Sequence, residues 1–140
     1  MDPEVATQLC ALGEEKFNMW KESATDAQKT VALEINAKAK TDPERMAKHM
    51  ASLNEHFVAA DANADGVLSR DEYLEFMRIS EAKYKADGMW VLESSEHDGK
   101  FYAVANMITP GTDGVSMADV MSATVVLSKR KQELMVENGM

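Results

Sequence analysis

Cysteine is nearly absent from this chain, which limits how the fold can be held together. The 140 residues contain one cysteine, Cys10, so no disulfide can form within the chain. A chain of this length can bury a hydrophobic core without disulfides, as one domain or as two small lobes. A single cysteine on an apolar helix face is typical of a small core residue and fits a reducing compartment.

Long hydrophobic runs are also missing. No apolar stretch approaches the roughly 18 residues that a transmembrane helix needs. The first residues, Met-Asp-Pro-Glu, lack the basic and apolar stretch of a signal peptide, and position 2 is not the glycine that myristoylation requires. We therefore expect no membrane span, a cytoplasmic location and a monomer.

Basic residues are too few for a nucleic-acid-binding protein. The chain has 24 acidic and 15 basic residues, with a formal net charge of −9. Backbone phosphates would be repelled by this charge, whereas cations and basic peptide segments would be attracted. The short basic run at residues 129–131 is typical of the solvated face of a late helix. We expect no nucleic-acid partner.

Sequence motifs of known catalytic sites are absent as well. The chain has no glycine-rich phosphate loop, no G-x-S-x-G motif and no set of nucleophile, base and orienting residue. His49 and His56 share a helix face at a spacing of seven, but no further ligand completes a metal or proton-transfer site. We interpret both as exposed helix histidines and predict that the protein is not an enzyme.

Residues 61–72 carry oxygen-bearing groups at a regular spacing. Calcium takes about six to eight oxygen ligands, and a twelve-residue loop surrounds it when positions 1, 3, 5, 7, 9 and 12 contribute. These positions hold Asp61, Asn63, Asp65, Val67, Ser69 and Glu72. Val67 would ligate through its carbonyl, Ser69 through a water molecule and Glu72 through both carboxylate oxygens. The sequence therefore predicts one calcium site, which magnesium could fill at rest.

The residues around this loop agree with that prediction. Gly66 stands where the loop must bend sharply, and Ser69 with Glu72 has the form of a capping box that would start the next helix. Apolar residues at helical spacing flank the loop on both sides, at Met46, Met50, Leu53, Phe57 and Ala60 before it and at Tyr73, Phe76 and Met77 after it. Residues 45–78 thus resemble the EF-hand family, which implies calcium binding between two helices.

A second, incomplete loop occupies residues 109–119. It keeps an Asp-Gly, an apolar residue, a serine and an acidic residue in EF-hand order, but it is one residue short. It resembles a degenerate EF-hand, with Asp119 in the place of Glu72 and no carboxylate at the first two ligand positions, so we expect it to hold calcium poorly. The resemblance implies a pair of loops joined by a short β bridge, and we predict Leu68 opposite Val115. A rival pairing uses residues 21–28, a turn with almost no ligand carboxylates.

The remaining pattern predicts an all-α fold: an EF-hand helix-loop-helix pair with an N-terminal helical extension. Residues 1–41 form the extension, which is a candidate vestigial EF-hand; residues 42–88 form the intact EF-hand; residues 89–140 form a connector and the degenerate EF-hand. We expect helices at about residues 3–21, 25–40 and 44–60, at 70–86, before Pro110 and from Met117 onward. Residues 94–99 are interpreted as a polar loop.

The sequence is compatible with two main functions. The first is a calcium sensor that presents a methionine-rich apolar surface to an amphipathic helix of a target protein. The second is a calcium buffer or structural subunit that does not open. In a third possibility, the apolar stripe of residues 5–20 occupies the groove of its own EF-hand pair and is displaced when calcium binds. Six methionines are predicted to face the core: Met46, Met50, Met77, Met107, Met117 and Met121.

Overall fold

The fold is built almost entirely of helices. The computed structural model describes all 140 residues, with the elements α1 (Pro3–Ser23), α2 (Asp26–Thr41), α3 (Arg45–Ala60), β1 (Val67–Leu68), α4 (Arg70–Ala86), α5 (Ser95–Ala105), β2 (Val115–Ser116) and α6 (Met117–Glu137). The all-α prediction is confirmed. No helix combines the length and the apolar character that crossing a membrane would need.

Local capping signals fix several helix ends where the sequence placed them. Asp2 caps α1, and both hydrogen bonds of a capping box form at Thr25 and Gln28 and again at Ser69 and Glu72. α4 ends at Ala86 before Gly88, which has φ of 85°. α3 begins at Arg45 rather than Glu44, after the Asp42 carboxylate has accepted a hydrogen bond from the Glu44 N–H.

The predicted polar loop at residues 94–99 is wrong, because these residues begin α5. Ser94 is the N-cap, and its hydroxyl accepts a hydrogen bond from the His97 N–H. Glu96 and Asp98 lie in the first turn, where carboxylates interact favourably with the helix dipole. Residues 89–93 are the non-helical connector.

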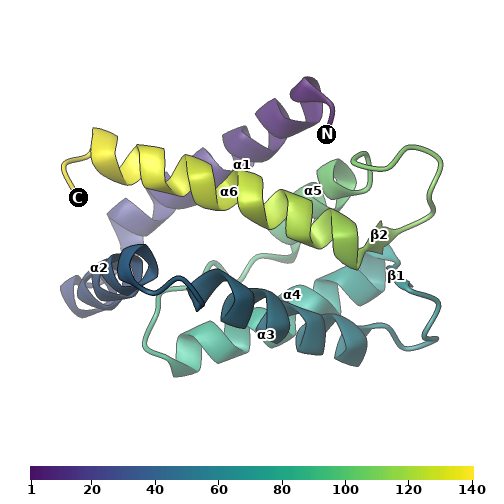
Figure 1. The fold of residues 1–140 in the computed structure, drawn as a ribbon, viewed down its shortest axis with the longest axis horizontal. Helices are drawn as coiled ribbons and strands as arrows, with labels where there is room; N and C mark the ends of the chain where they lie inside the picture. The colour runs from purple at the N-terminus through teal and green to yellow at the C-terminus, as the bar shows by residue number, and fades with distance from the viewer.

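The two loops lie side by side at one end of the molecule, as Figure 1 shows. β1 and β2 pair in antiparallel fashion, with Leu68 opposite Val115 as predicted, and both side chains are fully buried. α3 packs against α4, and α1 crosses α6 and also contacts α5. α1 joins α2 through Ala24 and Thr25 alone, so this connection is too short to wrap a metal ion.

The hydrophobic core extends from α1 to both helix-loop-helix units. Its main cluster has 13 buried residues and includes Val5 and Leu9 of α1 together with Leu53, Phe57 and Phe101. The stretches 1–41, 42–88 and 89–140 therefore share one core. A second cluster lies among α1, α2 and α6. Its buried residues are Phe17, Trp20, Ala24, Ala32, Leu134 and Met135, and Trp90 packs against them.

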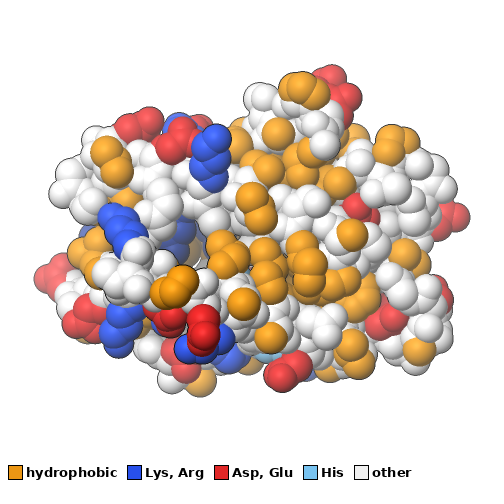
Figure 2. All heavy atoms as spheres, viewed as in Figure 1, with side chains coloured by type: hydrophobic (Ala, Val, Ile, Leu, Met, Phe, Trp, Pro, Cys, Tyr) orange, Lys and Arg blue, Asp and Glu red, His pale blue; other side chains and the backbone are white.

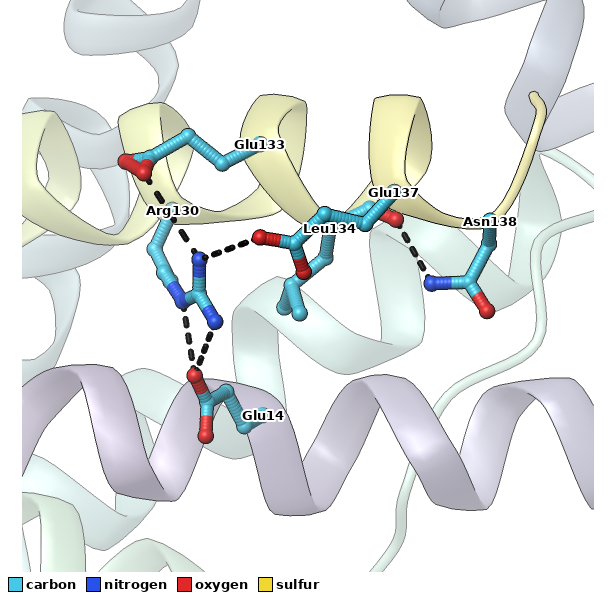
Figure 3. Close-up of polar contacts among 6 residues, drawn as sticks. All are labelled: Glu14, Arg130, Glu133, Leu134, Glu137 and Asn138. Carbon is cyan, nitrogen blue, oxygen red and sulfur yellow. Dashed lines mark hydrogen bonds and ion pairs between the residues drawn. The ribbon is translucent and has the colours of Figure 1, made fainter.

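Arg130 joins α6 to α1 at the surface of this second cluster. Figure 3 shows its guanidinium between Glu14 of α1 and two carboxylates of its own helix. Its Nε donates to Glu14 Oε1 at 2.7 Å, and Nη1 lies 3.6 Å from Glu133 and 3.4 Å from Glu137. Arg130 contacts carboxylates of both α1 and α6. This residue of the basic run 129–131 therefore contributes to the packing of these two helices.

Three of the six methionines predicted to face the core do not do so. Met46 is 44% exposed, Met107 43% and Met121 37%, whereas Met50, Met77 and Met117 pack against the main cluster. Met46 lies in α3 and Met121 in α6, whereas Met107 follows the end of α5. His56, interpreted as exposed, is buried, and its Nδ1 lies 2.9 Å from Ser80 Oγ.

We predict that Gly114→Ala destabilises the fold by about 2 kcal/mol. A Cβ at Gly114 would lie 2.7 Å from the Leu68 carbonyl oxygen in β1, and φ there is 134°. Gly111→Ala is the matched control, since Gly111 also has positive φ, 84°, but has no atom within 4 Å of a built Cβ. Urea unfolding should show the larger loss for Gly114; equal losses would mean that close strand approach costs nothing.

Candidate metal centre

The loop between α3 and α4 brings three carboxylates together. Ligand oxygens of Asp61, Asp65 and Glu72 lie within 4.8 Å of one another. Oxygens on opposite sides of one calcium ion, each about 2.3–2.6 Å from it, are separated by a similar distance. The spacing of the three groups therefore matches a shared divalent cation.

The backbone of the loop holds these carboxylates in place. The Gly66 N–H donates to Asp61 Oδ2 at 3.0 Å, and the Val67 N–H donates to Asp65 Oδ1 at 3.1 Å. Positive φ at Gly66, 84°, lets the chain turn there without steric strain. Asn63 also contacts Asp65, because its Nδ2 donates to Asp65 Oδ2 at 3.1 Å. The side chains are thus oriented inward by short-range contacts.

Glu72 closes the loop from the first turn of α4. Its Oε1 accepts the Ser69 N–H at 3.0 Å, and its Oε2 accepts the Ala62 N–H at 2.8 Å. The Ser69 hydroxyl in turn accepts the Glu72 N–H at 3.3 Å. Glu72 therefore reaches both the beginning and the end of the loop, as a ligand at position 12 must.

Hydrogen bonds keep two of the carboxylates ionised. The Val67 N–H is the main cause that lowers the pKa of Asp65, and the Ser69 N–H is the main cause for Glu72. Both groups therefore carry full negative charge at neutral pH. No proton must be displaced from either before a cation binds.

One oxygen of the cluster has no partner in the protein. Oδ1 of Asp61 is buried and accepts no hydrogen bond. An unpaired buried carboxylate oxygen costs free energy unless a cation or another group coordinates it. The donor set, which is made of oxygen atoms only, fits a hard cation such as calcium, and the ligands would be Asp61, Asn63, Asp65, Val67, Ser69 and Glu72.

The second loop uses its acidic residue differently. Asp119 is 2% exposed, and its Oδ1 accepts the Thr109 hydroxyl at 2.7 Å while Oδ2 accepts the Ser116 N–H at 3.1 Å. Both oxygens of Asp119 are therefore bonded within the protein, as both oxygens of Glu72 are. Asn106 also enters this loop, where its Oδ1 accepts the Gly114 N–H at 3.1 Å. Side chains and backbone groups of the protein therefore satisfy these polar groups of the second loop.

Sequence reasoning missed a second group of titratable residues, at the contact of α4 with α5. Glu81 interacts there with the buried Asp98, and the neighbouring His97, also buried, has its Nδ1 3.8 Å from Glu15 Oε1 of α1. Their signal was present, because His97, Phe101 and Val104 follow helical spacing and Ser94 is an N-cap residue. His49 lies apart from this group, with its ring centroid 6.4 Å from that of Tyr84.

Comparisons of this chain with protein-family models, with curated proteins and with solved structures found no match. The geometry of the two loops is therefore the basis for a functional assignment.

Proposed function

We propose that this protein binds one calcium ion in an EF-hand loop, residues 61–72, whose degenerate partner at residues 109–119 binds none. The observation that carries this proposal is the buried, unpartnered Oδ1 of Asp61 within a cluster of three carboxylates. The second loop supports it by contrast, because no carboxylate oxygen there is buried without a hydrogen-bond partner. Magnesium is the expected competitor, since it also prefers oxygen ligands.

We further propose that calcium binding acts as a signal and that the protein is a sensor. Apolar side chains gather on the face where α6 and α3 lie (Figure 2). The exposed large apolar residues of these two helices are Met46, Val58, Met121, Val125 and Val136. Methionine-containing surfaces adapt to different partner helices, so an amphipathic helix of a target protein is the proposed ligand of this face.

A calcium buffer is the second candidate, and the position of α1 favours it. Val5 and Leu9 already pack among residues from both sides of the candidate metal loop. A core filled by its own N-terminal helix has less apolar surface to expose when calcium binds. In that case calcium would stabilise the fold by mass action alone.

A calcium titration separates the two functions. Trp20 and Trp90 belong to the second cluster, away from the loop, so a change in their fluorescence reports a rearrangement that spreads beyond the site. For the sensor we expect this change together with increased binding of a hydrophobic dye. A rise in melting temperature with neither change would identify the buffer, and no effect of calcium on any of the three would refute calcium binding.

A further inference from the structure

Two carboxyl groups meet where α4 packs against α5. Glu81 and Asp98 line the same groove, where their carboxyl groups are close enough to influence each other. Asp98 is 6% exposed, and Oε1 of Glu81 is buried with no hydrogen-bond partner from the protein. Two ionised carboxylates in this position would repel each other, and their buried oxygens would lack solvation. A single proton held between them satisfies both groups.

The charged groups around the pair do not replace this proton. Both basic residues of the groove already pair with other carboxylates, Arg78 with Glu75 and Lys85 with Glu93 at 2.7 Å. Lys16 of α1 is the basic residue that acts on the pair itself. The other charged and titratable groups facing the pair are His97 of α5, Tyr73 of α4, Glu93 of the connector and Asp71 at the rim of the groove.

Burial has the largest influence on these groups. It raises the pKa of Glu81 to about 8, with Asp98 as the next cause, and it raises the pKa of Asp98 as well. Lys16 lowers both values without cancelling this effect. Burial also lowers the pKa of His97, so its ring is neutral at pH 7 and supplies no positive charge to Asp98.

We propose that Glu81 and Asp98 share one proton at neutral pH and that this proton fastens α4 to α5. Loss of the proton leaves two adjacent carboxylates, whose repulsion pushes the two helices apart. The pair is a pH-sensitive latch on the helix that also carries Glu72. This proposal does not depend on calcium binding at the loop.

The direction of the pH effect follows from proton linkage. Glu81 has a higher pKa in the folded protein than the usual value of 4.5, so the folded state holds a proton that the unfolded state has released. Stability is therefore greatest below pH 4.5 for this pair and is lost as the pH rises toward about 8. One proton changes the unfolding equilibrium constant by at most about tenfold per pH unit.

Urea unfolding at constant free calcium, from about pH 6.5 to about pH 9, tests the latch. The unfolding constant of the unmodified protein should rise several-fold more than that of Glu81→Gln, whose amide donates a hydrogen bond to Asp98 at every pH. Glu96→Gln is the matched control, because Glu96 is exposed in the first turn of α5 and undergoes the same charge change. Its pH profile should follow that of the unmodified protein. Parallel profiles for Glu81→Gln and the unmodified protein would overturn the proposal.

Infrared spectroscopy observes the proton directly and does not require a stable variant. The unmodified protein should show the carbonyl stretch of a protonated carboxylic acid at about pH 6.5 and lose it at about pH 9.5. The band should be absent when Glu81→Gln and Asp98→Asn are combined, and its absence from the unmodified protein at the lower pH would refute the shared proton. The variant Glu72→Gln lacks the closing ligand of the loop at residues 61–72. Adding calcium or magnesium to this variant should leave the carboxylic-acid band intact. Loss of the band on adding either ion would identify a cation site in place of the latch.

Discussion

Glu72→Gln is expected to weaken calcium binding by on the order of a hundredfold or more. Glu72 supplies two oxygens and one negative charge at the closing position of the loop. Its Oε1 and Oε2 accept the backbone N–H groups of Ser69 and Ala62. Glutamine can keep the first of these bonds, but its amide nitrogen would face the Ala62 N–H, donor against donor. Isothermal calorimetry should record little or no heat from calcium.

The control for this variant is Asp71→Asn, one residue earlier in the chain. The Asp71 side chain is 96% exposed and is not among the clustered carboxylates, although its substitution removes the same charge. We expect its calcium affinity to change by no more than about twofold, because an exposed charge outside the first coordination shell is screened by salt. Equal losses in the two variants would mean that net charge alone attracts the ion, and unchanged affinity in Glu72→Gln would refute the site.

The conformation of the loop at residues 61–72 was predictable because all its determinants are local. Its three carboxylates and the N–H groups that orient them lie within residues 61–72, and Ser69 with Glu72 forms both hydrogen bonds of the expected capping box. The pairing of Leu68 with Val115 spans distant residues but was inferred from the equivalent position of each within its loop. Matching two local patterns was therefore enough to predict one tertiary contact.

Burial was harder to predict, because it depends on which helix covers each face. His56 lies at helical spacing from His49, and nothing near it in the chain indicates that α4 brings Ser80 to within 2.9 Å of its ring. Met46 and Met121 lie on apolar faces of their helices, yet no third element covers them. Helical periodicity identifies an apolar face, but the packing of other elements decides whether that face is buried.

The Glu81–Asp98 contact could not be predicted from the sequence for the same reason. The two residues lie on different helices, and the second helix was interpreted as starting after residue 99. A helix beginning at Ser95 turns His97 and Asp98 inward, whereas a polar loop would have left them in solvent. One missed N-cap therefore concealed the interaction of Glu81 with the buried Asp98.

Leu9→Ala is expected to cost about 3–5 kcal/mol of unfolding free energy. Leu9 is fully buried in α1 and belongs to the main cluster, together with Phe57 and Phe101 from other helices. Truncation removes most of its buried apolar surface and leaves a cavity that packed helices on several sides cannot close. Urea unfolding with and without calcium measures the loss.

Leu33→Ala in α2 is the matched control, since Leu33 is 39% exposed and should cost less than about 1 kcal/mol. The comparison tests whether α1 is part of the core or a detachable extension. A large cost in calcium-free protein that becomes small in the calcium-bound form would mean that calcium releases α1, as a sensor regulated by its own N-terminal helix requires. A small cost in both forms would contradict the packing of Leu9, because a fully buried leucine cannot lose its side chain without effect.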